Sequence, residues 1–385
     1  MTAYDKTTLD ALRTRETAQE WLQEGLLSEE KWASIQAKYS GQFYSPNLFV
    51  RIGLAIFSNI LLSAAFGLSA LIASTDSDEG MSMLCFLFGV LSLGALEGWA
   101  IGMVRHFRSG VDDMLLYYGT GLILSSIFML MPFNTSILTY SCIALPFLLV
   151  GSIRYLDRLM AAATFFCALL IVLWIVKEVP DLALYLLPFS GMLFAAAWYV
   201  TARTGQKRYD WRYWHAQLMV VEILSLLLFY ASGNYWVIQQ TGADWFHLEQ
   251  VPIPGFFWTF TILVPVVYIL LGLLKKDRIL LDIGLACVAM AVFTFRFYFH
   301  VFPLAWTAVI SGAGLFALSY YSIRYLRTNA SKFSYEADRD ATLLQEIEQQ
   351  LIEQTISSQN PPNAPEKRDS FGGGAFGGSG AGGDF

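Results

Sequence analysis

Charged residues are scarce in this chain of 385 residues: Asp, Glu, Lys and Arg together make up 15% of it. Soluble domains carry roughly 25% charged residues, so this composition excludes a soluble two-domain enzyme. The net charge of −6 at pH 7 leaves no excess of basic residues to neutralise phosphates, which excludes a nucleic-acid-binding protein. Hydrophobic residues make up 55% and the mean hydropathy is +0.48, which excludes a disordered chain. The composition predicts an integral protein whose main partner is the lipid bilayer.

Cysteine and histidine are also rare, with four of each. The cysteines all lie in apolar runs and none forms a C-x-x-C pair, so they indicate small buried hydrophobes and neither a zinc site nor a disulfide framework. They are Cys85, Cys142, Cys167 and Cys287. The chain also lacks the H-E-x-x-H, G-x-S-x-G, Walker and dinucleotide-binding motifs. The sequence therefore predicts that the protein is not an enzyme and that it needs no cofactor or metal.

Long apolar runs, in contrast, are abundant. A helix that crosses the hydrocarbon core of a bilayer needs about 20 mostly apolar residues, and ten such runs follow one another. They cover residues 52–73, 81–104, 114–131, 136–153, 159–176, 182–201, 217–235, 256–274, 279–295 and 303–323. Because backbone that faces lipid must satisfy its own hydrogen bonds, each run is expected to be a helix. The predicted fold class is all-α, a polytopic integral membrane bundle of about ten transmembrane helices with a cytoplasmic N-terminal helical hairpin.

The basic residues predict the orientation of this bundle. Of the 25 Lys and Arg residues, only Lys177 and Arg296 fall on the side of the ten-span map opposite the N-terminus. Cytoplasmic loops carry an excess of Lys and Arg, so we expect a multi-pass protein of the bacterial cytoplasmic (inner) membrane with both termini in the cytoplasm. A miscounted span would exchange the sides of all later loops. The alternation of charge along the chain therefore also supports the even number of spans.

The chain divides into four regions by composition. They are a cytoplasmic helical hairpin at 1–48, the transmembrane domain at 49–325, a cytoplasmic acidic amphipathic helix at 326–359 and a disordered tail, first Pro-rich and then Gly-rich, at 360–385. In the hairpin, Thr7 or Thr8 is expected to cap the first helix and Ser28 the second. An anionic membrane surface would repel the acidic residues of 335–356. We therefore expect that helix and the C-terminal tail to bind a protein partner.

The first motif of the hairpin resembles that of a known family. Residues 21–30 read WLQEGLLSEE, which is similar to the opening motif of a prokaryotic family of predicted membrane proteins called domain of unknown function 2157. Members of that family have a hairpin of the form W-x-x-x-G-L-I-S-x-E followed by many hydrophobic spans. The chain departs from the family where an Asn-Trp pair closes the first span, since residues 70–74 read ALIAS. The family has no established activity, so the resemblance implies a membrane location and no chemistry.

Ionisable residues inside a membrane are costly and often functional. Glu97 and Glu222 fall within predicted spans, and Asn59 offers a polar partner from the first span. These three residues form the candidate intramembrane ion or proton site. A further acid, Asp282, follows Arg278 by four residues, which is the spacing of an ordinary helix ion pair.

Three glycines repeat at intervals of four residues around Glu97. They are Gly94, Gly98 and Gly102. Small residues at this spacing allow another helix to approach closely. We therefore expect the three glycines to form a helix-packing face, and we expect this packing to bury Glu97 inside the bundle.

Two functions fit these features. The first is a non-enzymatic scaffold or regulatory component that acts through its cytoplasmic ends. The alternative is a small-solute or cation transporter, proton-coupled, that uses Glu97. A water-lined cavity that reaches Glu97 would favour the transporter, and a solid bundle at that position would favour the scaffold.

Overall fold

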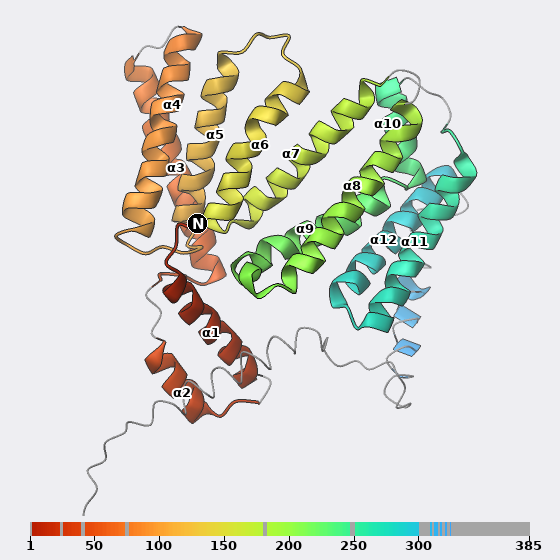
Figure 1. The fold of residues 1–385 in the computed structure, drawn as a ribbon, viewed down its shortest axis with the longest axis horizontal. Coiled ribbons are helices and arrows are strands. Elements are labelled where there is room, and N and C mark those ends of the chain that lie inside the picture. The colour runs from red at the N-terminus through yellow and green to blue at the C-terminus, as the bar shows by residue number, and fades with distance from the viewer. Residues whose placement is uncertain are drawn as a thin grey trace, which may run out of the picture. The chain divides into compact units, whose positions relative to one another are not determined.

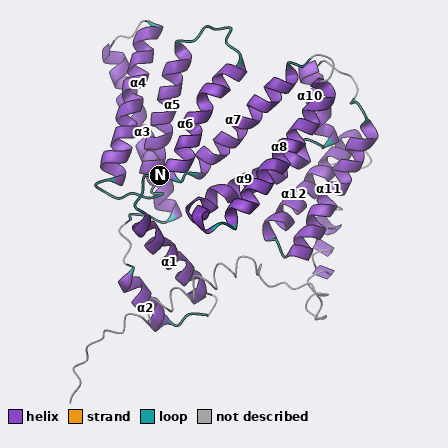
Figure 2. Ribbon diagram, viewed as in Figure 1, coloured by secondary structure: helices purple, strands orange, loops and turns teal. Residues whose placement is uncertain are grey.

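The computed structural model describes residues 2–23, 26–39, 43–73, 77–179, 183–246 and 251–299, together with scattered positions between 309 and 324. Helices dominate these residues and no strand is found among them (Figure 2). An isolated β-bridge joins Tyr44 to His106. The described part of the chain is therefore all-helical, as the sequence predicts.

Twelve α-helices, a π-helix (η1) and a 3-10 helix (η2) are found in the described residues (Figure 1). They are α1 (Lys6–Gln23), α2 (Glu29–Lys38), α3 (Leu48–Ala73), α4 (Asp78–Ala95), η1 (Leu96–Ile101), α5 (Val111–Met129), α6 (Ile137–Tyr155), α7 (Arg158–Lys177), α8 (Ala183–Gln206), η2 (Tyr209–Trp214), α9 (His215–Ala231), α10 (Tyr235–Phe246), α11 (Pro254–Lys275) and α12 (Arg278–Tyr298).

Eight helical segments of the described chain are long and apolar enough to cross a membrane. They are α3, α4 with η1, α6, α7, α8 from Tyr185, η2 with α9, α11 and α12. The third predicted span corresponds to α5, which has 19 residues like α6 but begins with Val111-Asp112-Asp113 and is not among the eight. The tenth predicted span, 303–323, lies mostly outside the described residues. The structure thus has the helices of a multi-pass membrane protein.

Helices that follow one another along the chain pack as pairs. The closest pairs are α4 with α5, α6 with α7, α8 with α9, and α11 with α12. Further contacts join α3 to α5 and join α7 to both α8 and α9 (Figure 1). Leu115 and Leu116 of α5 and Met160 of α7 share a buried apolar cluster with Leu96 of η1. Because α5 touches α3, α4 and α6, it occupies the inside of this group of helices.

The predicted glycine face does not form within the described structure. A Cβ atom added to Gly94 or Gly98 would meet no described heavy atom within 4 Å, and one added to Gly102 would meet the backbone of its own helical turn. Gly98 and Gly102 lie in or directly after the π-helix η1 (Leu96–Ile101), whose extra residue in each turn rotates them away from the helix face on which Gly94 lies. The expectation that these glycines pack against another helix is therefore wrong for the described part of the chain.

The N-terminal residues form α1 and α2, which contact each other. Ser28 accepts the Lys31 N–H at 3.4 Å and begins α2, as predicted. The residue that caps α1 is Asp5, whose Oδ2 accepts the Thr8 N–H at 3.1 Å. The prediction of Thr7 or Thr8 as this cap is wrong, because the earlier Asp5 places both threonines inside the first turn. The predicted helix at 335–356 and the tail lie outside the described residues.

Candidate functional site

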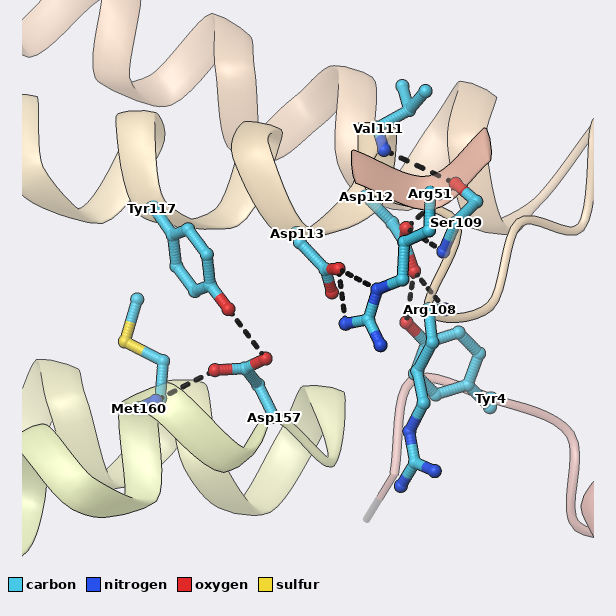
Figure 3. Close-up of polar contacts among 10 residues, drawn as sticks. All are labelled: Tyr4, Arg51, Arg108, Ser109, Val111, Asp112, Asp113, Tyr117, Asp157 and Met160. Atoms are coloured by element: carbon cyan, nitrogen blue, oxygen red, sulfur yellow. Dashed lines mark hydrogen bonds and ion pairs between the residues drawn. The ribbon is translucent and has the colours of Figure 1, made fainter. Parts of the chain in front are cut away.

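Three carboxylates lie close together where α5 and α7 begin, and we call Asp112, Asp113 and Asp157 the acidic cluster (Figure 3). Asp112 and Asp113 stand in the first turn of α5, and Asp157 caps α7. Both positions suit an acid, since the N-terminal end of a helix carries unpaired N–H groups and a partial positive charge. The local sequence therefore explains why each carboxylate is there, and the fold brings the two helix ends together.

Asp112 is buried and is surrounded by donors. Its Oδ2 accepts the Arg108 N–H at 2.7 Å, and its Oδ1 accepts the N–H and the hydroxyl of Ser109 at 2.8 and 2.9 Å. The Tyr4 hydroxyl donates to Oδ2 at a long 3.5 Å (Figure 3). Gly110 makes this turn possible: its φ is +95°, and a Cβ there would lie 2.3 Å from the Arg51 carbonyl oxygen. The turn before α5 therefore wraps its backbone around one carboxylate.

The other two members of the cluster connect helices. Asp113 pairs with Arg51 of α3, whose Nε and Nη2 donate to Oδ2 at 3.0 and 2.5 Å. Asp157 accepts the Met160 N–H at 2.7 Å and the Tyr117 hydroxyl of α5 at 2.8 Å. The cluster thereby ties α5 to α3 on one side and to α7 on the other.

Three residues near the cluster and outside the apolar spans have shifted pKa values. Burial, together with the charge of Asp112, raises the pKa of Tyr4, so its hydroxyl keeps its proton and donates at neutral pH. Burial lowers the pKa of His106 and the nearby charge of Asp112 partly opposes this, which favours a neutral imidazole at neutral pH. Burial also lowers the pKa of Arg108. These shifts follow from the enclosure of the loop between η1 and α5.

The contacts of the acidic cluster hold the turn before α5 and join α3, α5 and α7. Each carboxylate already accepts specific donors, and no group of three or more His, Cys, Asp or Glu side chains in the described residues could hold a metal ion. Sequence reasoning did not find this cluster. The available signal was Val-Asp-Asp after Gly110 and Asp157 before a helix, which predicts helix starts, but only the fold shows that the two starts meet.

Glu97 lies in η1 and is paired with an arginine. Arg154 of α6 donates from Nε to Oε1 at 2.7 Å and from Nη2 to Oε2 at 3.0 Å, and the Tyr155 hydroxyl donates to Oε1 at 2.6 Å. The Glu97 side chain is 43% exposed. The expectation that Glu97 is buried is therefore wrong, because no described helix covers the glycines beside it. Asn59 is exposed on α3 and is not a partner of Glu97 in these contacts.

Glu222 of α9 is fully buried. The Nε of Arg203 lies 3.1 Å from its Oε1, and Gln206 Nε2 donates to Oε2 at 2.8 Å. Arg203 also pairs with Asp277, which caps α12 by accepting the Leu280 N–H at 3.1 Å. Glu222 therefore belongs to an ion network that connects α8, α9 and α12, and it shares no partner with Glu97 among the contacts of the described residues.

The predicted pair of Asp282 with Arg278 is confirmed, with a separation of 3.9 Å on an exposed helix surface. None of three pockets found in the described structure has Glu97 among its lining residues. The three predicted members of an ion site, Glu97, Glu222 and Asn59, are thus not assembled into one site by the contacts described.

Comparison with known proteins found no matching family model, no matching curated protein and no matching solved structure. The resemblance to the domain of unknown function 2157 family stays a prediction from the motif at residues 21–30.

Proposed function

We propose that the chain is a ten-span protein of the bacterial cytoplasmic membrane with both termini in the cytoplasm. We further propose that it is a non-enzymatic scaffold or regulatory component that acts through those ends. The observation that supports this role is the attachment of the N-terminal segment (residues 2–23) to two separate parts of the helical bundle. A segment held in this way couples whatever binds it to the arrangement of the helices.

The first attachment joins the N-terminal segment to the ends of η1 and α6. The Ala3 N–H donates to the Arg154 carbonyl at 2.8 Å. Tyr4 and Leu9 are buried in an apolar cluster with Phe107, and the Tyr4 and Phe107 rings meet edge to face with centroids 4.9 Å apart. Burial of apolar side chains of this size stabilises the attachment by about 1.5–3 kcal/mol each.

The second attachment joins α1 to η2, the short helix before α9. Arg212 Nη2 donates to Asp10 Oδ2 at 3.0 Å, and the Tyr213 hydroxyl donates to the same oxygen at 3.0 Å. Arg212 also donates to the Tyr213 hydroxyl at 2.7 Å, which holds the two donors in position. The N-terminal segment therefore contacts both the α3–α7 part of the chain and the segment that leads into α9.

The outer surface of α2 is available to a partner. Ile35 is buried, whereas Glu29, Glu30 and Lys31 are exposed. Because α2 contacts α1, a protein that binds this surface would shift the position of α1 and thereby change both attachments. Residues 335–356 and the C-terminal tail are the second proposed partner-binding region.

The transporter alternative lacks comparable support. Glu97 is neutralised by Arg154, and it lines none of the three pockets. Glu222 is held by Arg203 and Gln206 in a buried network.

The test uses the full chain in its native membrane. Asp10→Arg should break the second attachment, the double variant Asp10→Arg with Arg212→Asp should restore it, and Glu30→Arg is a matched control on the exposed face of α2. Limited chymotrypsin digestion of membranes should cut within α1 faster in Asp10→Arg only, and none of these substitutions adds or removes an aromatic residue or leucine at which chymotrypsin cuts. Crosslinking and mass spectrometry should then show partners lost from Asp10→Arg and regained in the double variant.

A second arm removes residues 335–385 and repeats the crosslinking. We expect a distinct set of partners to be lost. An unchanged partner set in both the Asp10→Arg variant and the shortened chain would overturn the scaffold proposal.

A further inference from the structure

A pocket of about 460 Å³ lies where α6, α7, α8 and α9 meet η2. Trp198, Trp211 and Trp214 line it together with Phe165, so we call it the tryptophan pocket. Its volume falls within the range of small-molecule binding sites, roughly 300–1,000 Å³. Aromatic walls of this kind bind apolar molecules over a large area without a large loss of side-chain freedom.

One polar side chain in the wall has no partner. Gln217 of α9 is only 4% exposed, and neither its Oε1 nor its Nε2 has a hydrogen-bond partner among the described residues. A buried amide left in this way costs free energy, and native structures rarely tolerate it without a ligand or water. The unpartnered amide of Gln217 therefore indicates that the pocket holds an occupant with a hydrogen-bonding group.

Three other polar groups of the wall already have partners. The Thr164 hydroxyl donates to the Met160 carbonyl at 2.7 Å, and the Thr201 hydroxyl donates to the Ala197 carbonyl at 2.8 Å. The Trp214 Nε1 donates to the Ile153 carbonyl at 3.0 Å. Gln217 is the lining residue whose buried polar atoms are without a partner among the described residues, so we place the hydrogen bond of an occupant at its amide.

The charge and the opening of the pocket define the occupant further. No Asp, Glu, Lys or Arg is among its lining residues, so a charged group would gain no ion pair inside it. Two of its lining residues, Leu149 and Ile153, are each 41% exposed on α6, one of the helices apolar enough to cross a membrane. The pocket is therefore reached past a lipid-facing apolar surface, which favours molecules that partition into the bilayer.

We propose that the tryptophan pocket binds a neutral lipid alcohol, a molecule with an apolar body and a hydroxyl group. A hydroxyl can donate to Gln217 Oε1 and accept from Nε2 at the same time, which satisfies both atoms with one group. This inference does not rest on the proposed scaffold role: the pocket shares η2 with the second attachment of α1, but its test changes Gln217 of α9 and none of the attachment residues.

The probes are 11-bromo-1-undecanol and 1-bromoundecane, added to the full chain in detergent. Bromine quenches tryptophan fluorescence at short range, and three of the 11 tryptophans of the chain line the pocket. We expect saturable quenching by the alcohol. Gln217→Leu should weaken binding of the alcohol about five- to tenfold, the loss typical of one or two neutral hydrogen bonds. It should leave quenching by 1-bromoundecane unchanged, and Gln36→Leu, on the exposed face of α2, should change neither.

Thermal unfolding of Gln217→Met gives an independent measurement, because the methionine side chain has nearly the same shape as glutamine. Without probe, Gln217→Met should unfold at the same or a higher temperature than the wild type, because it removes a buried amide that has no partner. With 11-bromo-1-undecanol, the wild type should gain more stability than Gln217→Met. Equal quenching by the two probes with no selective effect of Gln217→Leu would overturn the proposal. So would a lower unfolding temperature of Gln217→Met without probe, since it would show that the amide is already satisfied by water or protein.

Discussion

Asp112 demonstrates how a carboxylate can be buried at the end of an apolar helix. Its charge is met by two backbone N–H groups, by the Ser109 hydroxyl and, at longer range, by the Tyr4 hydroxyl. Hydrogen bonds to a charged acceptor contribute about 1.5–3 kcal/mol each, and donors that lose a buried partner add the cost of being unsatisfied. At this scale, the stability of the loop before α5 depends on one side chain.

Asp112→Ala should lower the free energy of unfolding by about 2–4 kcal/mol, because it leaves the Arg108 and Ser109 N–H groups without their acceptor in a buried turn. The measurement is the shift of the thermal unfolding midpoint of the purified protein in detergent. Asp282→Ala is the matched control, since the Asp282–Arg278 pair is exposed and 3.9 Å apart. Equal shifts in the two variants would contradict the role given to Asp112.

The close contact between α4 and α5 depends on two glycines that the regular spacing of Gly94, Gly98 and Gly102 did not identify. Gly89 of α4 and Gly119 of α5 lie against each other: a Cβ on Gly89 would be 2.9 Å from the Gly119 carbonyl oxygen and 2.7 Å from Ile123 Cγ1. In contrast, Gly94 and Gly98 meet no described atom within 4 Å. Glycine therefore allows close helix packing at position 89, whereas the glycines at positions 94 and 98 meet no described neighbour.

Gly89→Ala should destabilise the protein by about 1–3 kcal/mol, because the nearest backbone atoms of α5 cannot move away by a side-chain rotation. Gly94→Ala in the same helix should be neutral or stabilising by up to about 1 kcal/mol, since alanine is the better helix former. Thermal unfolding of the two variants side by side provides the comparison. Destabilisation by Gly94→Ala that equals or exceeds that of Gly89→Ala would contradict this assignment and restore the predicted glycine face.

Sequence reasoning succeeded where the interaction is local to a helix. The Ser28 cap and the Arg278–Asp282 pair need only neighbours within four residues, so the spacing determines them. The partner of Glu97 is Arg154, which lies 57 positions further along the chain, and no spacing rule connects the two. The meeting of α5 and α7 at the acidic cluster is likewise a product of tertiary packing.

At the scale of the whole molecule, composition and apolar run length were sufficient to predict an all-helical membrane protein. Eight of the expected spans are found as long apolar helices. The third predicted span, α5, is not among these eight. It begins with two aspartates, and the donors of the preceding turn and Arg51 neutralise their charges. Mean hydropathy counts these aspartates as charged and does not include their pairing. The ten-span map therefore depends on the transmembrane character of α5, and also on the tenth predicted span, which lies mostly outside the described residues.

The ten-span map makes a prediction about sidedness that tests α5 directly. In a background in which the four native cysteines are replaced, single cysteines at Phe133, Gln240 and Lys276 would report the loop after α5, helix α10 and the loop after α11. If α5 crosses the membrane, a membrane-impermeant thiol reagent should label Phe133→Cys and Gln240→Cys on intact cells and should reach Lys276→Cys only after the membrane is opened. A helix of 19 residues is about 28 Å long, close to the thickness of the hydrocarbon core, so crossing is geometrically possible for α5. If α5 did not cross, every later loop would change sides. Phe133→Cys and Gln240→Cys would then be protected and Lys276→Cys labelled, and the concentration of Lys and Arg on one face would lose its explanation.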